Sequence, residues 1–119
     1  MKKQQRDDFN YLYDEIKGAS KLKVNDIREI ALKVTEETGE LAQQVLILYG
    51  FKKTRQSKER TMKNLKSEAV DVLIATLDIL NAVGATKKDI ISLNEKAVTK
   101  WRKKHLKTKQ LKTNTKKKR

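Results

Sequence analysis

Two stretches of the chain place pairs of carboxylates at a spacing that suits cation binding. The first reads TEETGEL and contains Glu37 and Glu40; the second reads SEAVDVL and contains Glu68 and Asp71. Within each pair the acids are three residues apart, which puts both side chains on one face of a helix. The sequence therefore predicts two helices that each present a carboxylate pair.

The surrounding apolar residues indicate that these acids interrupt packed helix faces. Glu37 and Glu68 fill gaps in two apolar lines, each three residues after one apolar position and four before the next. An amphipathic helix keeps such a line apolar, and a buried carboxylate is costly unless it is paired or binds metal. We therefore expect the two helices to form the walls of a hard-cation site. The lines consist of Ile27, Ile30, Val34, Leu41, Val45 and Leu48, and of Leu65, Val72, Ile79 and Val83.

The ligand types favour Mg²⁺, with Mn²⁺ as a substitute, because both prefer oxygen ligands. A di-iron bundle is the main competitor, but it needs a Glu-x-x-His pair from each of two helices. The only histidine is His105. The other alternative places the acids on solvated faces, paired with lysines. A solvated position is expected for Glu36, which lies one position off the apolar line. It is a weaker explanation for Glu37, Glu40, Glu68 and Asp71 taken together.

Composition indicates one helical domain. The chain has 119 residues, no proline and four glycines. It has no cysteine, which excludes disulfides and thiolate metal sites and fits a reducing, cytoplasmic compartment. The N-terminal residues are polar and charged, so no signal-peptide core is expected. Asp71 and Asp78 interrupt the most apolar stretch, so we expect no membrane span and no membrane partner.

Positive charge is concentrated at the C-terminus. The formal net charge is +14, and residues 103–119 hold nine Lys or Arg and no acid. Residues 1–102 keep 20 basic and 15 acidic residues, a net charge of +5. We therefore expect a helical domain over residues 1–105 and a basic, disordered tail over 106–119.

Apolar periodicity and capping residues predict four helices in the domain. Gly18, Gly50 and Gly84 are expected to end the first three, and Asn25 to cap the second. A capping box formed by Thr86 and Asp89 opens the last. The expected helices cover residues 7–16, 26–49, 57 or 58–83, and 87–105.

The paired motifs, Glu-x-x-Glu followed by Glu-x-x-Asp, resemble the signature of the MazG-like, all-α nucleotide pyrophosphohydrolases. The resemblance covers about residues 25–102, and it implies a four-helix-bundle-like architecture. It implies that Glu37, Glu40, Glu68 and Asp71 bind Mg²⁺, and that Glu36 helps to orient water or metal. The implied reaction cleaves a nucleoside triphosphate between the α and β phosphates, giving the monophosphate and pyrophosphate.

Weaker matches concern substrate binding. The sequence Asn-Glu-Lys at 94–96 resembles an Asn-x-Lys element of that family. The family often has arginine where this chain has Thr99 or Lys100. Asp78 is expected either to contact base or ribose or to cap the polar end of the core. Gly39, inside a helix, suggests close helix approach or room for phosphates. The resemblance implies that Asn94, Lys96, Lys100 and Arg102 reach phosphates or base.

Further apolar positions predict self-association. Leu46 and Ile47 on the second helix, and Ile74 and Leu77 on the third, lie off the lines that hold the acids. A lone small bundle would leave such faces exposed. We therefore expect a homodimer or homotetramer, which the resemblance also implies.

The alternative function is nucleic-acid binding without catalysis by a basic helical protein. No helix-turn-helix spacing, zinc site or aromatic platform supports it. The tail still predicts weak, non-specific, salt-dependent contact with nucleic acid. A third interpretation, a scaffold that has lost its metal site, conflicts with the intact acids.

Overall fold

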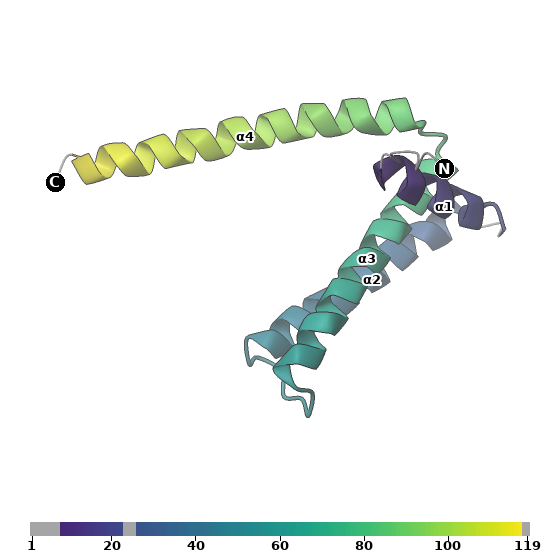
Figure 1. Cartoon of the computed structure of the whole chain (residues 1–119), viewed down its shortest axis with the longest axis horizontal. Helices are drawn as coiled ribbons and strands as arrows, with labels where there is room; N and C mark the ends of the chain where they lie inside the picture. Colours follow the sequence, from purple (N-terminus) through teal and green to yellow (C-terminus); the bar gives the residue numbers. More distant parts are fainter. Residues whose placement is uncertain (1–7, 23–25, 118–119) are drawn as a thin grey trace, which may run out of the picture. The chain divides into compact units, whose positions relative to one another are not determined.

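The computed structural model describes residues 8–22 and 26–117. These residues form four helices and no strand, which confirms the all-α prediction (Figure 1). The chain divides into two compact units, residues 1–84 and residues 85–119. The first contains three helices and the second contains one. They are α1 (Asp8–Ser20), α2 (Ile27–Leu48), α3 (Lys58–Ala82) and α4 (Lys87–Lys117).

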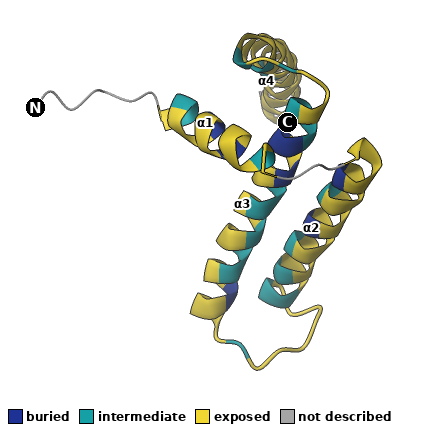
Figure 2. Cartoon of the chain, turned by 90° about the vertical axis from the view of Figure 1, so that its right-hand side faces the viewer, coloured by how far each residue is buried: buried dark blue, intermediate teal, exposed yellow. Residues whose placement is uncertain are grey.

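Helices α2 and α3 form a hairpin, and α1 packs against α3. Figure 2 shows buried and half-buried residues on the facing sides of α2 and α3 and exposed residues on their outer sides. The apolar periodicity of both helices explains this arrangement, because it gives each of them one side to bury. The small apolar core consists of Tyr13, Ile16, Ile30, Ala75 and Leu77.

The ends of α2 show which capping predictions hold. Asp26 is the N-cap and accepts a hydrogen bond from the backbone N–H of Arg28 at 2.8 Å. The predicted cap, Asn25, lies outside the described residues. Gly50 ends the helix as predicted, with φ of 77°. Its N–H donates to Ile47 and that of Phe51 donates to Leu46, which satisfies two of the last carbonyls.

Two predicted helix ends differ from the structure. Helix α1 continues past Gly18 to Ser20, and α4 continues to Lys117 instead of ending at 105. Residues 106–117, predicted to be disordered, are therefore helical. After Gly84 the sequence contains no glycine or proline to stop a helix, and lysine, leucine and glutamine favour one. The predicted capping box is confirmed, because Thr86 and Asp89 exchange hydrogen bonds of 2.9 and 3.1 Å.

The hairpin leaves apolar side chains on its surface, although not all those predicted. Leu46 and Ile74 are exposed, and Ile47 is half-buried. Leu77 was predicted to lie on an outer face, but it is buried, so this prediction was wrong. The reason is that α1 packs on α3 and covers part of its surface. The exposed large apolar residues of the hairpin also include Val45, Tyr49, Phe51, Met62, Val70 and Leu73. No described helix is long and apolar enough to cross a membrane.

Candidate metal centre

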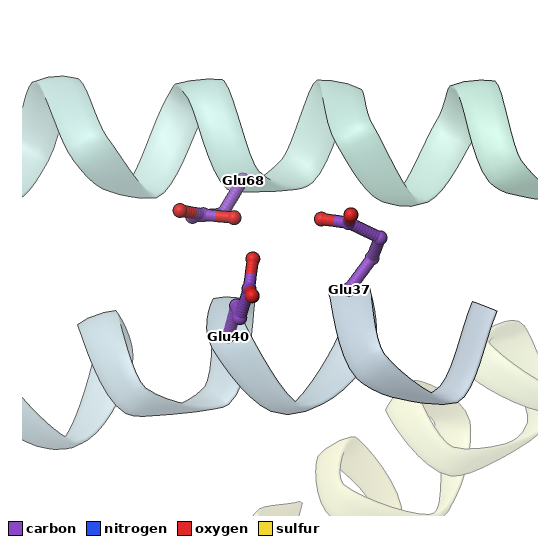
Figure 3. Close-up of side chains that lie close together, drawn as sticks. All are labelled: Glu37, Glu40 and Glu68. Carbon is purple, nitrogen blue, oxygen red and sulfur yellow. The ribbon is translucent and has the colours of Figure 1, made fainter. Parts of the chain in front are cut away.

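Three of the four predicted acids converge between α2 and α3. Glu37 and Glu40 project from α2 and Glu68 projects from α3 into the space between the helices (Figure 3). One carboxylate oxygen from each residue lies within 4.8 Å of the other two. This spacing is compatible with one shared cation, since oxygen ligands on opposite sides of a Mg²⁺ ion lie about 4 Å apart. The pairing of carboxylates across two helices was predicted from their places in the apolar lines.

Glu37 is the most enclosed acid of the cluster. Its exposed fraction is 7%, because it takes the place of an apolar residue on the side of α2 that faces α3. Its Oε1 accepts a charge-assisted hydrogen bond from Lys33 Nζ at 2.9 Å, one helical turn earlier. Its Oε2 is buried and has no hydrogen-bond partner. One oxygen of this buried carboxylate is therefore left without a compensating interaction.

Glu68, on the opposite helix, also has a buried carboxylate oxygen without a hydrogen-bond partner. Its side chain is half-buried, and its Oε2 is buried without a hydrogen-bond partner. Buried polar atoms in folded proteins nearly always have a partner, and an unpaired one costs about 1–3 kcal/mol, more when it is charged. Two such oxygens in one cluster indicate that the arrangement is suited to a ligand that both can bind.

Repulsion between the acids affects protonation at Glu40. The negative charge of Glu37 raises the pKa of Glu40, and desolvation and a hydrogen bond with Glu68 raise it further. The hydrogen bond with Glu37 raises the pKa of Lys33, assisted by the charge of Glu36. The neighbouring charges thus shift Glu40 toward its protonated form and Lys33 toward its charged form, compared with isolated side chains. A divalent cation would oppose protonation of Glu40, because metal binding requires ionised carboxylates.

The other predicted acids of the first unit lie outside this cluster. Asp71 is half-buried one turn beyond Glu68, but its shorter side chain does not join the group of three. Glu36 is exposed, and its Oε1 lies 3.6 Å from Lys33 Nζ. Asp78 is buried on α3, as are Ala75 and Leu77.

Four of the five predicted substrate-binding residues belong to the second unit, whereas Asp78 lies in the first. The four are exposed on α4: Asn94, Lys96, Lys100 and Arg102. Trp101 is also exposed, and its ring meets that of His105 edge-on at 4.9 Å between centroids. The acids and these residues thus come from different units of the chain.

Two residues near the cluster were missed in the sequence. Lys33 pairs with Glu37 at a spacing of four residues, a favourable helical interval for opposite charges that could have identified it. Gln44 lies seven residues after Glu37 on the same side of α2, and its Oε1 is buried without a hydrogen-bond partner. Its place in the apolar line could have identified it by the reasoning used for Glu37.

Comparison with known proteins supplies no further assignment. No family model, no curated protein and no solved structure matches this chain. The description of the site therefore depends on its own residues.

Proposed function

We propose that the protein is a Mg²⁺-dependent nucleotide pyrophosphohydrolase of the MazG-like type. It cleaves nucleoside or deoxynucleoside triphosphates between the α and β phosphates and releases the monophosphate and pyrophosphate. Two independent features support the proposal. One is the paired acidic motif in the sequence, and the other is the meeting of three of its four acids between α2 and α3.

The observation that carries the proposal is the state of Glu37. A carboxylate in the packed side of a helix, 7% exposed and with an oxygen lacking any partner, is unfavourable for folding alone. A solvated acidic face would not bury it. The other two acids of the cluster, Glu40 and Glu68, increase the repulsion instead of relieving it. A bound divalent cation would satisfy all three residues at once.

Glu37, Glu40 and Glu68 would hold Mg²⁺ or Mn²⁺, with Asp71 as the fourth ligand of the motif. When bound, such an ion neutralises charge on the phosphates and lowers the pKa of a coordinated water. The protein residues would position it: Glu37 and Glu68 are held by helix packing, whereas Glu40 is exposed. Glu36, exposed beside Lys33, is the candidate for orienting the attacking water.

The substrate requires cations beyond the metal, because a triphosphate carries about four negative charges and cleavage develops more on the leaving pyrophosphate. Lys96, Lys100 and Arg102 are the proposed phosphate contacts, with Asn94 beside them for phosphate or base. Asp78 is the least favoured of the substrate residues, since it is buried with the core.

The exposed apolar surface of the hairpin supports a homodimer or homotetramer. Leu46 on α2 and Ile74 on α3 remain 45% and 43% exposed. Other large apolar side chains of the two helices are also exposed. A second copy of the chain would bury these side chains, and two-fold symmetry is the commonest arrangement for such contacts.

The test is release of pyrophosphate from mixed nucleoside triphosphates, measured with and without Mg²⁺. Glu40→Gln and Asp71→Asn should each abolish turnover while far-UV circular dichroism stays helical. Glu15→Gln, an equivalent neutralisation on an exposed position of α1, should leave turnover unchanged. Wild-type activity in these variants, or undiminished wild-type activity in excess chelator, contradicts the proposal.

A further inference from the structure

The part of α4 that follows Glu95 carries charge of a single sign. From Lys96 to Lys116 the sequence has nine Lys or Arg and no acid, and every residue from 99 to 116 is exposed. Favourable interaction with the helix dipole explains basic residues in the last turn only. A cationic surface extending over five turns attracts polyanions, and the two available classes are nucleic acids and anionic membranes.

The distribution of apolar residues argues against a membrane surface. Helices that lie in the membrane interface gather their apolar side chains on one side. Beyond position 99, α4 has three large apolar residues, Trp101, Leu106 and Leu111. At about 100° per residue, Leu106 lies about 140° around the helix from both of the others. This part of α4 therefore lacks a continuous apolar face to insert.

Most of the cations form two rows on nearly opposite sides of the helix. The first row repeats at steps of four, three and four residues, and the second at steps of seven. At about 100° per residue each row spans at most about 60°, and their centres lie about 150° apart. The rows consist of Lys96, Lys100, Lys103 and Lys107, and of Arg102, Lys109 and Lys116.

Two opposite rows of cations match the surroundings of a helix in the major groove of B-form DNA. That groove is about 12 Å wide, admits an α-helix and has a phosphate strand along each side. Continuous basic helices use this geometry. The major groove of A-form RNA is too narrow for a helix, and single strands need aromatic platforms, whereas Trp101 is the only aromatic residue of α4 apart from His105.

Two faces of α4 separate the rows. The narrower one carries no charge over residues 99–113, whereas the wider one carries Lys104 and Lys112. The narrower face presents Thr99, Leu106, Gln110 and Thr113. The hydroxyls of Thr99 and Thr113 donate to the backbone carbonyls of residues four positions earlier, at 2.7 and 2.9 Å. They are therefore not available as donors to base edges. Gln110 alone keeps an amide that can contact a base edge, so this face offers little sequence discrimination.

We propose that α4 binds duplex DNA in the major groove through phosphate contacts from both rows, with little sequence preference. This inference does not depend on the proposed hydrolysis. Seven phosphate contacts predict that log K falls with log salt at a slope of about −6. Affinity should then decrease on the order of 10⁴-fold between 50 and 200 mM salt.

The test uses the full chain, a fluorescent 20-base-pair duplex and anisotropy at several salt concentrations, with chelator and without nucleotide. The variant Lys107→Gln/Lys109→Gln/Lys116→Gln removes three row cations that have no part in the proposed hydrolysis site. It should reduce the salt slope by about 3 and weaken binding on the order of a hundredfold at 0.1 M salt. The control Lys53→Gln/Lys58→Gln/Lys63→Gln removes equal charge from exposed positions near the hairpin loop and should bind almost as wild type does.

Competitors of equal charge identify the partner. Unlabelled duplex DNA should displace the probe at lower concentration than double-stranded RNA, single-stranded DNA or vesicles containing phosphatidylserine. Preference for any of these three overturns the groove proposal, as does equal weakening by the test and control variants. Because the measurement excludes Mg²⁺ and nucleotide, its outcome is separate from that of the pyrophosphate assay.

Discussion

Replacing Glu68 by glutamine distinguishes two interpretations of the acidic cluster, a metal site and a purely structural group of acids. Glu37 and Glu68 have carboxylate oxygens within 4.8 Å of each other, and Oε2 of each is buried without a partner. At an effective dielectric constant of about 20, two unit charges at that distance repel by about 3 kcal/mol. Glu68→Gln removes this repulsion without removing an ion pair, because the described part of the chain gives Glu68 none.

In excess chelator, Glu68→Gln should therefore be more stable than the wild type by about 1–3 kcal/mol. This corresponds to roughly 4–8 °C in Tm for each kcal/mol in a unit of this size. In Mg²⁺ at a hundred times its Kd, the wild type should gain about 2.7 kcal/mol and the variant much less. In Mg²⁺ the wild type should then be as stable as Glu68→Gln or more stable.

Thermal unfolding followed by circular dichroism, in chelator and in Mg²⁺, measures both effects. Glu15→Gln is the matched control, because it neutralises an exposed glutamate outside the cluster, and it should respond to Mg²⁺ as the wild type does. If Glu68→Gln is less stable than the wild type in chelator, the Glu68 charge stabilises the fold. If wild type and variant gain equal stability from Mg²⁺, the cluster is not where the ion binds.

Three further predictions concern other parts of the molecule. Gly39→Ala should raise the free energy of unfolding in urea by about 1 kcal/mol, because an added Cβ meets nothing within 4 Å; destabilisation would show a constraint at this position. Hydrogen bonds from the side chain and backbone of Arg28 lower the pKa of Asp26, so its contribution to stability is present above the ordinary value of 3.8 and is lost as pH falls through the lower folded value. Asp26→Asn should accordingly reduce the loss of stability in acid titrations, and an unchanged acid profile would contradict that role. Light scattering should give a dimer or tetramer, and an active species at the 13.8 kDa monomer mass would show that the apolar surface of the hairpin needs no second copy.

The sequence predicted the three acids that meet between α2 and α3 better than it predicted the position of Asp71. Glu37 and Glu68 take apolar positions in strongly periodic helices, so their place between α2 and α3 follows from periodicity. Glu40 follows from its spacing to Glu37. The separation of Asp71 from the group depends on side-chain length and on the rotation of α3, which spacing does not determine.

The positions of helix ends and the coverage of outer faces were less predictable. Gly18 was predicted to end α1, but it does not have the positive φ of Gly50 and Gly84, and the helix continues to Ser20. Leu77 was expected on an outer face because periodicity describes one helix at a time, whereas α1 packs on α3 in the folded unit. Helix α4 extends beyond residue 105 because its basic C-terminal part contains no glycine or proline, so high charge alone does not end a helix.

The central claim is tested most directly by the products formed from a nucleoside triphosphate. ³¹P NMR of the protein incubated with each deoxynucleoside and ribonucleoside triphosphate in Mg²⁺ distinguishes the two possible bond cleavages. The account predicts growth of monophosphate and pyrophosphate signals with at least one substrate, and their absence with Glu40→Gln. Diphosphate and orthophosphate as the products, or no product from any of these substrates at micromolar protein, would contradict it.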